Sequence, residues 1–130
     1  MSCPACSGDL VSFPVPADLQ TFLPGDTPGA SVCQSCLAIQ PEPAPPAAVP
    51  DLTVLGDAIP DDAAAAVPVV LLVGLLDSLA LHREEITALL ERVEREGVDP
   101  LLVLDRLDAR YGERAHVDLG SRRRQLEQLL

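Results

Sequence analysis

The 130-residue chain contains no lysine and no asparagine, and its nine basic residues are all arginines. The first of them is Arg83, so residues 1–82 carry no basic side chain apart from the histidine at position 82. Proteins that bind a phosphate backbone do so largely with Lys and Arg side chains that displace counterions. This lack of cations argues against nucleic-acid binding by the N-terminal part of the chain.

Acidic residues outnumber basic ones by 20 to nine, which gives a formal net charge of −11. This acidic, lysine-free composition resembles that of proteins from salt-accumulating halophiles, haloarchaea in particular. Molar salt shortens the Debye length to about 3 Å, so surface charge there serves hydration and solubility more than long-range attraction. An acidic excess is also a general means of keeping proteins soluble, and both interpretations stay open.

Long apolar runs are lacking as well. The uncharged stretch 63–76 has 14 residues, whereas a membrane-spanning helix needs about 20. The N-terminus has neither the basic region nor the apolar region of a signal peptide. We therefore expect a cytoplasmic protein without a membrane segment.

Sequence motifs of catalysis are also missing: the sequence has no Gly-rich phosphate loop, nucleophile elbow or metalloprotease motif. The two histidines, His82 and His116, lie in no pattern of known mechanism, and capping or surface positions account for both. The run 122–124 of three arginines is expected to form a solvated face or to pair with acidic side chains of the same chain. We expect no enzyme activity.

The cysteines are few and regularly placed. Cys3 and Cys6 form one Cys-x-x-Cys pair, and Cys33 and Cys36 form another after 26 intervening residues. Two residues between cysteines let one tight turn direct both sulfurs at one point, and two such turns give the tetrahedral shell that Zn²⁺ prefers. A shell of four protein ligands has no open position for water or substrate. We predict one structural zinc ion bound by these four cysteines.

Other uses of the four cysteines stay open. A rubredoxin-like iron site has the same ligands, although Phe13, Phe22 and Tyr111 are the only aromatic residues. Thioredoxin-type chemistry needs a Cys-x-x-Cys motif between a strand and a helix, whereas Cys3 has two residues before it and a turn after it. Two disulfides are less expected than a metal in a cytosolic chain.

Residues 1–40 are predicted to form a zinc ribbon. Residues 10–15 and 30–32 have the character of short strands, and Pro14 places the first at an edge or ends it. Pro24-Gly25-Asp26 indicates a turn. The segment has too few apolar residues to fold unaided, so the metal is expected to supply the remaining order.

Residues 41–60 are predicted to be a linker. Its first half, residues 41–50, is rich in Pro and Ala, favours polyproline II and acts as a semi-rigid spacer. In its second half, Leu52, Val54, Leu55 and Ile59 are available to pack against one of the two flanking modules.

Residues 61–130 show helical periodicity and are predicted to form a bundle of three or four helices. The apolar stretch 63–76, with Pro68 near its first turn, is the expected centre of this bundle. Further helices are predicted from His82 to Gly97, from Asp99 to Gly112 and from Asp118 to Leu130. The expected inward-facing leucines of the last two helices are Leu101, Leu102, Leu104, Leu107, Leu126, Leu129 and Leu130. The expected fold class is α+β, with a ribbon followed by helices.

Several stretches carry a resemblance to a known group of proteins. They are CPACSGDL at residues 3–10, LLDSLAL at 75–81, VDPLLVLDRL at 98–107 and RRRQLEQLL at 122–130. Together they resemble a small haloarchaeal zinc-ribbon family of unknown function, with a Pro-rich spacer and a Leu-rich helical tail. The resemblance implies fold, zinc and habitat, and it assigns no activity. The start also resembles the broader C-P-x-C-G zinc-finger group, but Ser7 stands where that motif has Gly.

We therefore expect a non-enzymatic, zinc-stabilised adaptor whose helical region docks a partner protein or a second copy of the chain. One alternative is a nucleic-acid-associated regulator of transcription or translation, whose binding would fall steeply with salt. Another is a rubredoxin-like or thiol redox protein. A coloured iron–thiolate centre would distinguish the rubredoxin-like form from colourless zinc.

Overall fold

The computed structural model describes residues 2–23 and 27–130, so the turn predicted at residues 24–26 lies outside the described residues. The elements, in chain order, are β1 (Leu10–Pro14), the 3₁₀ helix η1 (Ala17–Phe22), β2 (Gly29–Cys33), β3 (Ile39–Glu42), η3 (Leu52–Leu55), α1 (Ala63–Leu75), η4 (Leu76–Ser78), α2 (Arg83–Arg95), α3 (Pro100–Tyr111), η5 (Gly112–Arg114) and α4 (Leu119–Glu127). Within these residues a three-stranded sheet precedes four α-helices, which confirms the predicted α+β class.

The sheet is antiparallel, with β2 between β1 and β3. Phe13 pairs with Ala30 across β1 and β2, and Val32 pairs with Ile39 across β2 and β3. Both prolines of the sheet, Pro14 and Pro41, lie in edge strands, where a missing N–H group is tolerated. This is why β3 continues into the proline-rich sequence as far as Glu42.

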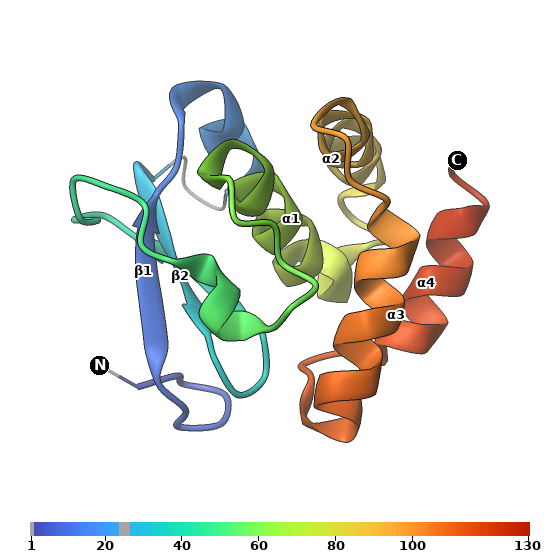
Figure 1. Ribbon diagram of the computed structural model, residues 1–130, viewed down its shortest axis with the longest axis horizontal. Helices are drawn as coiled ribbons and strands as arrows, with labels where there is room; N and C mark the ends of the chain where they lie inside the picture. The colour runs from blue at the N-terminus through green and yellow to red at the C-terminus, as the bar shows by residue number, and fades with distance from the viewer. Residues whose placement is uncertain (1, 24–26) are drawn as a thin grey trace.

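Helix α1 lies between the sheet and the other three helices (Figure 1). Every residue of α1 from Ala65 to Leu75 is buried, as expected for a helix that is apolar on all sides. The helix begins at Ala63 because the Asp62 carboxylate accepts a hydrogen bond from the Ala64 N–H at 3.1 Å. Pro68 consequently lies in the second turn, close to the first turn near which the sequence analysis placed it.

One hydrophobic core joins the sheet to the helices. Phe13 and Val32 of the sheet belong to the same cluster of buried side chains as Leu71 of α1 and Leu107 of α3. The 51–60 segment packs against this core as predicted, through Leu52, Leu55 and Ile59, whereas Val54 is 47% exposed. The division into segments 1–40, 41–60 and 61–130 stays a sequence prediction, and their apolar side chains share one core.

Helix ends follow the predicted signals. Asp99 and Asp118 accept hydrogen bonds from backbone N–H groups at the starts of α3 and α4. Gly97 and Gly112, with φ of 82° and 53°, follow the ends of α2 and α3, in the left-handed region that glycine adopts readily.

Two of the leucines expected to face inward do not. Leu102 is 47% exposed, and Val103 is buried in its place. Helix α4 ends at Glu127, so Leu130 lies beyond the helix and is 57% exposed.

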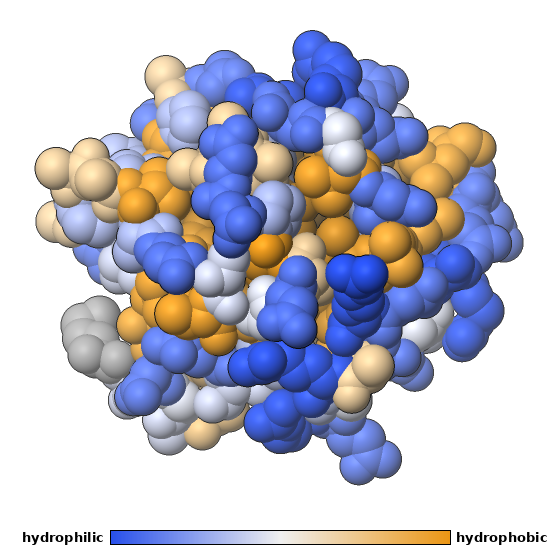
Figure 2. Space-filling model, viewed as in Figure 1, coloured by the Kyte–Doolittle hydropathy of each residue, from blue (hydrophilic) through white to orange (hydrophobic). Residues whose placement is uncertain are grey.

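Polar contacts also connect the N-terminal half of the chain to helices of the C-terminal half. Arg92 of α2 donates a hydrogen bond to the Asp18 carboxylate at 2.6 Å, and the Tyr111 hydroxyl donates one to the Leu55 carbonyl oxygen at 2.6 Å. Hydrophilic residues are spread over the face seen in Figure 2, with small hydrophobic patches between them. None of the helices in the described residues has the length and apolar character needed to cross a membrane.

Candidate metal centre

The two cysteine pairs lie in hairpins with the same backbone geometry. In the first, the Ser7 N–H donates to the Cys3 carbonyl oxygen at 2.8 Å; in the second, the Leu37 N–H donates to the Cys33 carbonyl oxygen at 2.9 Å. Ser7 and Leu37, each four residues after the first cysteine of its pair, have φ of 63° and 69°. Non-glycine residues rarely adopt this region, so the same unfavourable conformation is held twice.

Each hairpin also directs a backbone N–H group at a sulfur. The Ala5 N–H lies 3.4 Å from the Cys3 Sγ, and the Ser35 N–H lies 3.3 Å from the Cys33 Sγ. Both donors stand two residues after the accepting cysteine. Such bonds favour the thiolate, which is the form that binds metal.

The two hairpins bring the four sulfur atoms together. The sulfurs of Cys3, Cys6, Cys33 and Cys36 all lie within 4.8 Å of one another. The Cys3–Cys36 and Cys6–Cys33 sulfur distances are 3.8 and 3.4 Å, and all four cysteines are free thiols. A tetrahedral zinc site with Zn–S bonds of about 2.3 Å requires sulfurs about 3.8 Å apart, whereas a disulfide requires about 2.05 Å. The cluster therefore fits a four-coordinate metal ion and does not contain disulfides.

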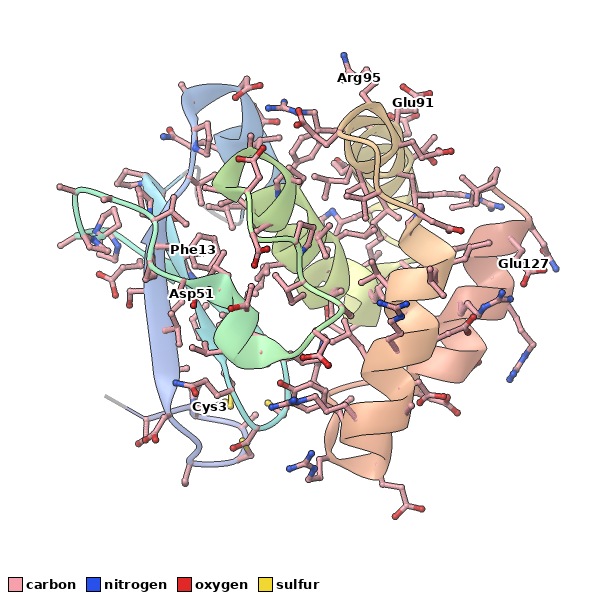
Figure 3. All side chains as sticks on the ribbon, in the orientation of Figure 1. Cys3, Phe13, Asp51, Glu91, Arg95 and Glu127 are labelled. Atoms are coloured by element: carbon pink, nitrogen blue, oxygen red, sulfur yellow. The ribbon has the colours of Figure 1, made fainter. Side chains whose placement is uncertain are left out.

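The cluster is mostly shielded from water. Cys3, Cys33 and Cys36 are buried, and Cys6 is exposed. Leu10, at the start of β1, packs against the cluster. Sulfur atoms are visible near the labelled Cys3 at one end of the sheet (Figure 3). The ribbon therefore presents one edge of its sulfur cluster to solvent.

The thiols do not ionise alike in the absence of a cation. Burial raises the pKa of the Cys36 thiol to about 12, and the neighbouring thiols add to the rise. Burial also opposes ionisation of Cys3, but hydrogen bonds from the backbone of Ala5 and Cys6 outweigh it and lower the pKa of this thiol to about 7. A bound cation removes this conflict, because it stabilises all of the thiolates at once.

Glycine at position 8 allows the two hairpins to approach closely. A Cβ atom on Gly8 would lie 2.6 Å from the Ser35 Oγ and 2.9 Å from the Cys33 Sγ. The next residue, Asp9, accepts a hydrogen bond at 2.9 Å from the Gln34 N–H with its carbonyl oxygen. The turn predicted after the first pair is thus also the contact surface for the second.

His116 connects the metal centre to the helices. Its backbone N–H donates to the Cys36 carbonyl oxygen at 2.8 Å, and its Nε2 lies 3.1 Å from the Val73 carbonyl oxygen in the last turn of α1. The half-buried imidazole therefore caps a helix carbonyl, and burial lowers its pKa. The sequence allowed a capping role for His116. The contact with Cys36 could not be predicted, because the two residues are 80 positions apart in the sequence.

The other sequence candidates lie outside the cluster. His82 occupies the N-cap position of α2, makes no capping hydrogen bond with its side chain, and lies 4.0 Å from the Glu85 carboxylate. Arg123 pairs with Asp105 at 2.7 Å and with Glu127, which matches the predicted pairing within the chain. Surface hollows of about 360, 470 and 540 Å³ are present, and no cysteine lines any of the three.

The comparisons with known proteins identify one family. The model of a family of unknown function (DUF6276) matches residues 2–130, which include all four cysteines and all four α-helices. No curated protein and no solved structure matches the chain. Since the match spans the ribbon and the helices together, the chain belongs to this family of unknown function, DUF6276.

Proposed function

We propose that this protein is a non-catalytic adaptor whose N-terminal ribbon is stabilised by one zinc ion. Cys3, Cys6, Cys33 and Cys36 are its four ligands. The observation that carries the proposal is the convergence of their sulfurs within 4.8 Å from two hairpins of matching geometry. A metal with four protein ligands stabilises the fold and has no position left for a substrate.

Zinc suits this site better than iron or a redox-active dithiol. Tetrahedral tetrathiolate sites hold either zinc or iron, and the chain has only three aromatic residues with which to surround an iron centre. The first Cys-x-x-Cys pair leads from Cys3 through a turn into β1 and not into a helix, whereas a thioredoxin-type pair opens a helix.

The charge distribution favours a protein partner over a nucleic acid. The ribbon, in residues 1–40, contains no arginine or lysine, so it offers phosphate groups no cation. The helical part, in contrast, has a large apolar side chain in water: Leu81, between η4 and α2, is 83% exposed. The helical part is the proposed interaction surface.

The acidic composition supports a protein adapted to concentrated salt, as in haloarchaea. The chain has a net charge of −11, and hydrophilic residues are spread over the face seen in Figure 2. In molar salt the repulsion among these charges is screened within about 3 Å. Apolar contacts then contribute more to partner binding than charges at a distance.

Metal analysis of the protein purified under reducing conditions tests the zinc site. We expect one zinc per chain in the wild type, less than one in Cys36→Ser, and one in the matched control Ser35→Ala, which keeps every sulfur. Iron in place of zinc, or equal zinc in Cys36→Ser and wild type, would contradict the site as proposed.

The adaptor role is tested on the zinc-loaded protein. We expect immobilised wild type to retain a defined protein partner from an extract of the source cells, with Leu81→Asp retaining much less. Binding through the helical part would be contradicted if wild type and Leu81→Asp retained the partner equally. It would also be contradicted if the retained material were nucleic acid that a nuclease removes.

A further inference from the structure

A hollow of about 360 Å³ lies between the α1–α2 connection and α4. Leu79, Leu81 and Arg83 line it from the connection and the start of α2. Arg122 and Leu129, from α4 and the residues after it, line the opposite side. The hollow therefore combines leucine side chains with two arginines in a protein whose net charge is −11.

The leucines give the hollow an apolar rim. Leu81 is 83% exposed, while Leu79 and Leu129 are half-buried and pack against the main core. A single exposed leucine is ordinary on a protein surface. Here, however, the exposed side chain lines the same hollow as the two partly buried leucines, so a partner's apolar side chain that enters the hollow would cover Leu81.

The arginines give the hollow positive charge. Within the described residues neither Arg83 nor Arg122 has an ion-pair partner, whereas Arg92 has two. The Arg122 Nη1 donates a hydrogen bond to the Gln125 Oε1 at 2.9 Å. A carboxylate is the acceptor that matches an arginine best.

Among the residues that line the hollow one is acidic, Asp77, and its carboxylate accepts a hydrogen bond from the Ser78 hydroxyl at 3.3 Å. The start of α2, at Arg83, has no side-chain cap, but Glu84 and Glu85 lie in its first turn and offset the positive end of the helix. The attraction for a carboxylate therefore comes from the arginine side chains that line the hollow.

We infer that this hollow binds a short segment of a partner protein in which an Asp or Glu side chain neighbours a leucine-sized apolar side chain. The carboxylate pairs with Arg83 and Arg122, and the apolar side chain covers Leu81. The inference rests on the proposed adaptor function and names the chemistry of its partner.

A second copy of the chain fits the hollow less well. In a two-fold contact the same patch faces itself, so Arg83 and Arg122 of one copy meet the same arginines of the other. An acidic partner segment avoids this repulsion, because its carboxylates take the place of the opposing arginines.

Selection from a library of random heptapeptides displayed on phage tests this inference. The zinc-loaded full chain is the target, at the lowest KCl concentration at which it stays folded. We expect the selected peptides to share an acidic residue next to Leu, Ile or Met. As synthetic peptides, they should bind Arg122→Gln and Leu81→Ser at least about tenfold more weakly than wild type, a change of about 1.4 kcal/mol.

Arg95→Gln is the matched control, because Arg95 is an exposed arginine of α2 that does not line the hollow (Figure 3). It should bind the peptides as wild type does, and all variants should keep one zinc per chain and the wild-type melting temperature. Selected peptides without acidic residues, or peptides that bind Arg122→Gln and Leu81→Ser as they bind wild type, would overturn the inference. A wild-type dimer that the Leu81→Ser substitution converts to monomers would also overturn the inference, since a second copy would then fill the hollow. If zinc content and partner capture stayed normal while one of these results was obtained, the inference would be wrong and the adaptor proposal would still hold.

Discussion

Replacing Gly74 with alanine would place a methyl group at the point where α1 crosses β3. A Cβ atom at position 74 would lie 2.4 Å from the Ile39 Cγ2, 2.6 Å from its Cγ1 and 2.8 Å from its Cδ1. Carbon atoms in ordinary contact stay about 3.5–4.0 Å apart, so the overlap is about 1 Å. The α1–β3 contact would have to open, or Ile39 would have to leave its position.

Two opposing effects set the magnitude. Alanine in a helix interior is about 1 kcal/mol more favourable than glycine, while overpacking a core costs about 1–3 kcal/mol. We expect Gly74→Ala to lower the free energy of unfolding by up to about 2 kcal/mol. In an Ile39→Ala background, which removes all three overlapping atoms, the same change should be neutral or stabilising.

Urea unfolding of the zinc-loaded protein, followed by circular dichroism, measures these differences. Gly120→Ala in α4 is the matched control, because the nearest side-chain atom to its Cβ would be the Asp108 Oδ2 at 3.3 Å. We expect this control to be neutral or stabilising. If Gly74→Ala stabilised the protein as much in the wild type as in Ile39→Ala, the packing of α1 on the sheet would not be as described.

Three further changes address the metal centre, the ion pair between Asp18 and Arg92, and the surface charge. Gly8→Ala should weaken zinc binding at least about tenfold in a chelator competition, since its Cβ would lie 2.9 Å from the Cys33 Sγ. An unchanged zinc affinity would refute the close approach of the two hairpins. The Arg92 guanidinium lowers the pKa of the Asp18 carboxyl. Asp18→Asn should therefore be less stable than the wild type near neutral pH, and this difference should disappear as the pH falls below about 4 and the Asp18 carboxylate is protonated. A difference that does not depend on pH would contradict the ion pair. Raising the KCl concentration from about 0.1 to about 2 M should raise the melting temperature by about 4 °C or more, because salt screens the repulsion in a chain of net charge −11. A lower melting temperature in about 2 M KCl would argue against adaptation to salt.

Local signals in the sequence predicted most of the helices. Gly97 and Gly112 after the ends of α2 and α3, and the capping carboxylates of Asp99 and Asp118, are visible without tertiary information. The cysteine spacing likewise predicted which four side chains meet, because two short turns restrict where their sulfurs point.

Contacts between distant segments were beyond the sequence argument. Gly74 stands within the apolar stretch 63–76, and the sequence did not reveal that Ile39, 35 residues earlier in β3, packs against it. His116 gave no sign that its backbone reaches the second cysteine hairpin. The ribbon's shortage of apolar residues was clear, but periodicity does not reveal that its sheet shares the core of the helices.

The shared core also refines what the metal is expected to do. Phe13 and Val32 are buried against the helices through side chains that need no metal. The left-handed residues Ser7 and Leu37, in contrast, lie in the hairpins that carry the sulfurs. We therefore expect metal removal to release the two hairpins first and to affect α1 least.

Hydrogen exchange of the reduced protein, with and without a zinc chelator, tests the central claim most directly. With one zinc per chain, the amides of Ser7 and Leu37 should be protected, since each donates a hydrogen bond within its hairpin. After chelation they should exchange at least about tenfold faster, while the amides of α1 stay protected. Protection of the hairpin amides that is the same in metal-free and zinc-loaded protein would contradict the account.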